Sequence, residues 1–133
     1  MIYQETIEIK TKKGVWIKNV TEEIKKIVEK SEITDGLCNI FLSATTAGLM
    51  INESEMMLFE DLKNFFKNIA DESKIYQHQS NSFSHLRAGL LKPDITIPIT
   101  DGKLVLGTWQ TVLLFEFDVT DRKRELIVTV IGE

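Results

Sequence analysis

The feature that most constrains the fold is the segment TWQTVLLFEFD at residues 108–118. Successive residues of a strand point to opposite faces of its sheet, and here both faces carry large apolar side chains. Alternation places Leu113 and Phe115 on one face. Val112 and Leu114 fall on the other. We therefore expect a central strand that is covered on both sides.

Two polar residues of this segment, Gln110 and Glu116, would then lie where water is excluded. An unpaired buried polar group costs about 1–3 kcal/mol, so each needs a partner. That partner could lie in the core, in a cleft or across a subunit interface. Gly107, just before the segment, would let another backbone or a ligand approach closely.

Strand-like sequence occurs at both ends of the chain. Residues 2–17 alternate apolar and polar side chains around a KKG turn, which predicts a β-hairpin. Residues 94–133 are nearly all strand-like, with turn signals at 101–102 and 118–123. A further strand is expected at residues 37–44, with alternate residues in the core.

Helices are predicted between these strands. Thr21 is the expected N-cap of the first, Ser54 of the second and Ser84 of a short third. The apolar stripe of the second helix comprises Leu58, Leu62, Phe65, Phe66 and Ile69. The order of elements predicts a single α+β domain over residues 1–133, with a mainly antiparallel sheet or sandwich and two or three short helices.

Charge and cysteine content bear on the partners and the compartment of the protein. Lys and Arg total 16 against 20 for Asp and Glu, a net charge of -4, whereas nucleic-acid binding needs a concentrated basic face. The single cysteine, Cys38, cannot form an internal disulfide, which favours a reducing compartment. No apolar run approaches the roughly 20 residues of a membrane helix, and the N-terminus alternates like a strand rather than a signal peptide. We expect a cytoplasmic protein without a nucleic-acid or membrane partner.

Polar residues follow directly on the apolar strand sequence at 37–44. Thr45 and Thr46 come first, and Asn52 and Glu53 stand just before the second helix. Threonine is an ordinary strand residue and asparagine an ordinary turn residue, so local propensity explains them as readily as a binding site does.

The only histidines of the chain are His78 and His85, in a polar segment. Their spacing does not suit a ligand pair on one helix, but the segment could fold back and bring both to a metal. Surface histidines are the alternative. Asp61 lies at the border of the second helix's apolar stripe, where a solvated carboxylate is the simpler interpretation.

Several motifs occur in an order known from one protein family. They are TTAGLMINESE, DLKNFF, YQH, SHLRAGLL, IPITDGKLVLGTWQTVLLFEFD and RELIVTVIGE. In these motifs the chain resembles the YjbQ-like family, whose members are often labelled secondary thiamine-phosphate synthase. The resemblance implies a compact α+β fold rich in sheet, a homotrimer and a site between subunits.

The resemblance also implies roles for polar residues that the pattern had already singled out. The implied catalytic carboxylates are Glu53, Asp61 and Glu116, and the implied metal ligands are His78 and His85. A small phosphorylated ligand would contact Thr45, Thr46, Asn52, Trp109, Gln110 and one or both of Arg122 and Arg124. The implied reaction joins a pyrimidine-methyl diphosphate to a thiazole phosphate, and a divalent metal (Mg²⁺ or Zn²⁺) or basic side chains would neutralise the leaving pyrophosphate.

The chain departs from the family pattern at Ala44, where members usually have a histidine before the two hydroxyl residues. Lys92 replaces a common glycine, and the segment between the two histidines is shorter and lacks acidic residues. Three alternatives stay open. The chain is a thiamine-phosphate synthase-type enzyme, a trimer that binds a small anion or metabolite after losing a site histidine, or a structural oligomer.

Overall fold

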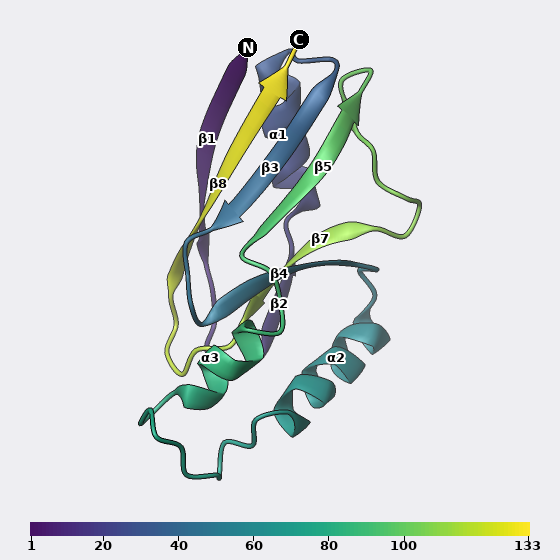
Figure 1. Ribbon diagram of the computed structural model, residues 1–133. Coiled ribbons are helices and arrows are strands. Elements are labelled where there is room, and N and C mark those ends of the chain that lie inside the picture. Colours follow the sequence, from purple (N-terminus) through teal and green to yellow (C-terminus); the bar gives the residue numbers. More distant parts are fainter.

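The computed structural model describes residues 1–133 as two antiparallel sheets and three helices (Figure 1). The first sheet has the order β1 (Ile2–Lys10), β8 (Lys123–Gly132), β3 (Gly36–Leu42), β5 (Asp94–Thr100) and β6 (Lys103–Leu104). The second has the order β2 (Trp16–Asn19), β7 (Thr111–Glu116) and β4 (Ala47–Asn52). The helices are α1 (Thr21–Ser31), α2 (Met56–Asn68) and α3 (Ser82–Ala88). The predicted α+β class is confirmed.

The main core lies between the two sheets and α1, and a smaller core lies between β7 and α2. Val112 and Leu114 of β7 belong to the main core, whereas Leu113 and Phe115 pack toward Phe66 of α2. The prediction of a central strand covered on both sides is therefore confirmed. No helix lies over the outer face of the five-stranded sheet (Figure 1).

Cys38 is a core residue with a fully buried side chain. Burial raises the pKa of its thiol to about 12, so the reactive thiolate is scarce at neutral pH. None of the helices combines the length and apolar character that crossing a bilayer requires.

The predicted N-terminal hairpin is wrong. β1 pairs with β8 and β2 with β7, so the two strands belong to different sheets. Alternation is a local signal that identifies a strand but not its partner. The KKG segment instead carries the chain from one sheet to the other, where Lys13 N–H donates to Asp121 Oδ1.

The start of the central strand also differs from the prediction. β7 begins at Thr111, and Trp109 and Gln110 lie in an exposed turn before it. The Gln110 side chain accepts a hydrogen bond from Gly107 N–H at 2.8 Å instead of entering the core. Only Glu116 is buried, and it has the partners that its burial requires.

All three predicted N-cap residues are wrong, because none of their side chains forms a capping hydrogen bond. Thr21 is the first residue of α1 and lacks a capping bond. α2 is capped by Glu55, not Ser54, since the Glu55 carboxylate accepts from the first helical N–H groups. Ser84 lies inside α3, where its hydroxyl donates to the Phe117 carbonyl.

Candidate functional site

A pocket of about 720 Å³ lies where the two sheets meet, beside the crossover from β7 to β8. It is bounded by the β3–β4 connection, the first turns of α3 and the residues that follow β7. Ala44 lies in its wall, just beyond the end of β3. Its polar lining comprises Ser43, Thr45, Thr46, Asn81, His85, Asp118, Arg122 and Arg124.

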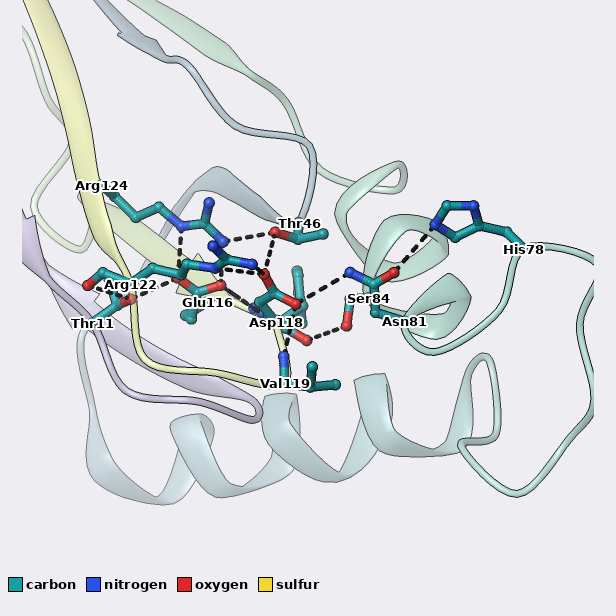
Figure 2. Close-up of polar contacts among 11 residues, drawn as sticks. Thr11, Thr46, His78, Asn81, Ser84, Glu116, Asp118, Val119, Arg122 and Arg124 are labelled. Atoms are coloured by element: carbon teal, nitrogen blue, oxygen red, sulfur yellow. Dashed lines mark hydrogen bonds and ion pairs between the residues drawn. The ribbon is translucent and has the colours of Figure 1, made fainter.

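Glu116 is fully buried beneath this pocket and binds Arg124 (Figure 2). Its two oxygens accept from Arg124 Nε at 2.7 Å and Nη2 at 2.6 Å, the bidentate geometry of strong ion pairs. The Thr11 hydroxyl donates at 2.6 Å, and the backbone N–H groups of Phe117 and Asp118 donate to Oε2. Because both oxygens are engaged inside the protein, Glu116 holds Arg124 in place rather than facing a ligand.

Asp118 is the second buried carboxylate, and it binds Arg122 Nε at 2.8 Å. Its other donors are the Thr46 hydroxyl at 3.2 Å, Asn81 Nδ2 at 3.3 Å and Val119 N–H at 2.8 Å. Burial by itself raises the pKa of Asp118. The hydrogen bonds from Val119, Asn81 and Arg122 outweigh burial, so this pKa lies below its ordinary value of 3.8.

Thr46 joins the two ion pairs into one network, because it accepts from Arg124 Nη2 at 2.7 Å and donates to Asp118. Strand register explains the convergence: Ala47 pairs with Glu116 across β4 and β7, and Ile9 pairs with Arg124 across β1 and β8. We name Thr46, Glu116, Asp118, Arg122 and Arg124 the arginine cluster. The Nη1 group of each arginine has no protein partner and is free to bind a ligand.

The two histidines lie together, with ring centroids 4.9 Å apart and ring planes at 89°. His78 Nε2 lies 3.2 Å from Asn81 Oδ1, whereas the His85 imidazole has no hydrogen-bond partner in the protein. Structural and catalytic zinc sites use three or four protein ligands. The structure has no group of three His, Cys, Asp or Glu side chains that could hold a metal ion, and Ala44 offers no donor atom. The residues of a single chain therefore do not fit a three-ligand metal site.

A second group of predicted residues lies at the other end of β4. Asn52, Glu53, Trp109 and Gln110 line a shallow pocket of about 410 Å³ with Ile51. We name these four polar and aromatic residues the tryptophan patch, since Trp109 is 71% exposed. The length of β4, at about 3.3 Å per residue, separates the patch from the arginine cluster by roughly 17 Å.

Comparison with known proteins places the chain in a family. Residues 5–133 match the family model described as UPF0047 protein YjbQ-like. The chain belongs to the YjbQ-like family. A UPF0047 protein of Archaeoglobus fulgidus is 39% identical over 125 residues, which cover 92% of this chain and 96% of the relative. The UPF0047 protein YjbQ of Escherichia coli O157:H7 is 28% identical over 140 residues, covering 100% of both chains.

Solved structures agree with this assignment. A YbjQ-like protein of Sulfolobus solfataricus P2, described as being of unknown function, has a TM-score of 0.95 at 34% identity. The match covers 100% of this chain and 99% of that chain. Family membership thus agrees with the fold and with the resemblance that the sequence motifs indicated.

The structure divides the predicted site residues of this YjbQ-like protein into three places. Around the pocket lie Thr45, Thr46, His78, His85, Glu116, Arg122 and Arg124. The tryptophan patch contains Asn52, Glu53, Trp109 and Gln110. Asp61 joins neither group and is exposed on α2, so its catalytic role stays a prediction without a neighbouring site.

Sequence patterns missed three residues of the pocket network: Thr11, Asn81 and Asp118. Asp118 could have been found, since alternation places it on the same face as the buried Glu116. Its place in a turn-like segment concealed that signal. Thr11 and Asn81 reach the network from distant segments, and no local pattern predicts such contacts.

Proposed function

We propose that this YjbQ-like protein binds a small phosphorylated ligand in the pocket beside Ala44. The arginine cluster carries this proposal. Two guanidinium groups are fixed by buried carboxylates, yet each keeps a free Nη1 group. Arginine is well suited to phosphate because its planar donors match phosphate oxygens. Preorganised donors also lower the entropy lost on binding.

Other groups around the pocket suit the same ligand. The Thr45 side chain is exposed in the pocket, and the His85 imidazole has no competing partner. Glu116 and Asp118 balance the charges of the two arginines, so the cluster has little net charge. Recognition then depends on directed hydrogen bonds, which favours a ligand whose phosphate sits close to both Nη1 groups.

Titration calorimetry with inorganic pyrophosphate tests the proposal directly. Arg122→Gln removes a charged donor at the pocket and is expected to weaken binding by about tenfold or more. Lys123→Gln is the matched control, because Lys123 is adjacent in sequence but exposed near Glu8 at 3.9 Å. Equal affinities of wild type and both variants, or no binding to wild type, would contradict a phosphate site here.

A thiamine-phosphate synthase-type reaction is the second candidate, favoured by the position of His85 in the same pocket as both arginines. In that reaction a thiazole nitrogen forms a bond to the pyrimidine methylene carbon as the bond from that carbon to the pyrophosphate oxygen breaks. Arg122 and Arg124 would stabilise the charge that develops on the leaving pyrophosphate. Because Ala44 replaces the family's histidine, the alternative is that the protein has lost this activity and still binds the anion.

Mass spectrometry of thiamine phosphate formed from the two substrates separates these candidates. Wild type, Ala44→His and Glu53→Gln are compared under the same conditions, together with their zinc content. Product that forms in wild type would support the transferase, and less product in Glu53→Gln would mean that Glu53 reaches the pocket from a neighbouring chain, because within one chain it lies in the tryptophan patch. If pyrophosphate binds but no variant forms product, the binding proposal stands and the transferase is excluded. Activity or zinc gained only by Ala44→His would identify Ala44 as the altered site position.

We also propose that the protein assembles as a homotrimer in which neighbours complete the site. A cyclic trimer needs two different patches that meet head to tail. The tryptophan patch and the arginine cluster lie at opposite ends of β4, and a largely exposed tryptophan is typical of an interface hot spot. Light scattering at several concentrations tests this assembly, and a monomer throughout would overturn it.

A further inference from the structure

Asn81 lies between the arginine cluster and the histidine pair. Its Nδ2 atom donates to Asp118 Oδ1 at 3.3 Å, and its Oδ1 atom faces His78 Nε2 at 3.2 Å (Figure 2). His78 in turn meets the His85 ring edge to face. A continuous chain of contacts therefore runs from a buried carboxylate to an imidazole that lines the pocket.

The orientation of the Asn81 amide is determined by its neighbour. Asp118 is buried and paired with Arg122, so it is an ionised carboxylate that can only accept hydrogen bonds. The amide NH₂ must therefore face Asp118, which leaves the amide oxygen toward His78. A flipped amide would place two acceptors against each other. His78 must consequently carry a hydrogen on Nε2, and its neutral form has the lone pair on Nδ1.

The Asn81 side chain does not cap helix α3, although it stands at the N-cap position. Asn81 occupies the N-cap position of α3, where asparagine normally bonds to the N–H groups of the first turn. Here it forms no such bond, and its side chain contacts Asp118 and His78 instead. The helix thus lacks a side-chain cap while the amide orders the pocket.

We propose that Asn81 is a positioning residue that fixes His78 as the Nε2–H tautomer and thereby holds the His85 imidazole in the pocket. The His85 imidazole makes no hydrogen bond, so its orientation depends on packing such as the edge-to-face contact with the His78 ring. The tautomer follows from the contacts alone. The consequence for ligand binding rests on the proposed phosphate site.

Imidazole ¹⁵N NMR of labelled protein at neutral pH tests the tautomer. Wild type is expected to show His78 protonated on Nε2 alone. Asn81→Ser places another residue favoured at N-cap positions before α3 but cannot span Asp118 and His78, so His78 should become a mixture of tautomers while thermal stability is kept. Gln79→Ala is the control, since its exposed side chain makes no hydrogen bond to either group. An unchanged His78 spectrum in Asn81→Ser would overturn the proposal.

Pyrophosphate titration then tests the link to the pocket. Affinity should fall about three- to tenfold in Asn81→Ser and stay unchanged in Gln79→Ala. Unchanged affinity in Asn81→Ser, with mixed tautomers, would overturn the positioning of His85. If wild type binds no pyrophosphate, the phosphate site fails, whereas the NMR result still decides the role of Asn81 in fixing His78.

Discussion

The two ends of strand β4 carry similar polar residues in opposite physical states. At one end the carboxylates of the arginine cluster, Glu116 and Asp118, are buried, and each accepts several hydrogen bonds. At the other end the tryptophan patch is open, with Trp109 71% exposed. The difference arises from what lies beside each end: Arg122 and the start of β8 with Arg124 lie beside the first, whereas an exposed turn before β7 lies beside the second. One end of β4 thus has its carboxylates paired within the chain, whereas the other presents exposed groups that the proposed trimer would cover.

The same substitution at both ends should produce the largest contrast in stability. Glu116→Gln leaves Arg124, which is 11% exposed, without its charge partner and should lower the free energy of unfolding by about 3–5 kcal/mol. Glu53→Gln at the tryptophan patch should change it by at most about 0.5 kcal/mol, because that carboxylate has no side-chain partner. Urea unfolding of both variants measures the contrast. Similar losses would show that the patch is as integrated as the cluster.

The sequence predicted the need for this buried pair but not its geometry. Apolar residues on both faces of β7 indicated a central strand, and a charged residue within it had to have a partner. The partner, Arg124, is in another sheet, and strand pairing between sheets is decided by tertiary packing that alternation does not report.

The wrong prediction for Trp109 and Gln110 also has a specific cause. Trp109 has high β-propensity, and with Gln110 it extends the alternation of β7, so both were predicted to lie in the strand. In the structure the Gln110 side chain binds Gly107 N–H and the chain turns before β7 begins. The turn was visible only as a single glycine. By contrast, the family resemblance depends on motifs rather than on local propensity, and its candidate residues lie both around the pocket and in the tryptophan patch.

Acid titration isolates the contribution of Asp118 to the arginine cluster. Its pKa in the folded protein lies below 3.8, so the unfolded chain takes up this proton first as the pH falls. The stability that the ionised carboxylate provides is complete above pH 3.8 and is lost as the pH falls toward the folded pKa. Urea midpoints between pH 5 and pH 2 should decline more steeply for wild type than for Asp118→Asn. Parallel declines would show that Asp118 has the same pKa in both states.

The smallest effect on the single chain is expected at Trp109. Trp109→Ser removes a side chain that is 71% exposed, so the free energy of unfolding of dilute protein should change by at most about 0.5 kcal/mol. Assembly should respond differently, because a central aromatic at an interface typically contributes about 2 kcal/mol or more. Light scattering should then show Trp109→Ser dissociating at concentrations where wild type stays assembled. A large loss of stability that is independent of concentration would instead make the tryptophan patch part of the folding unit, and the contrast between the two ends of β4 would disappear.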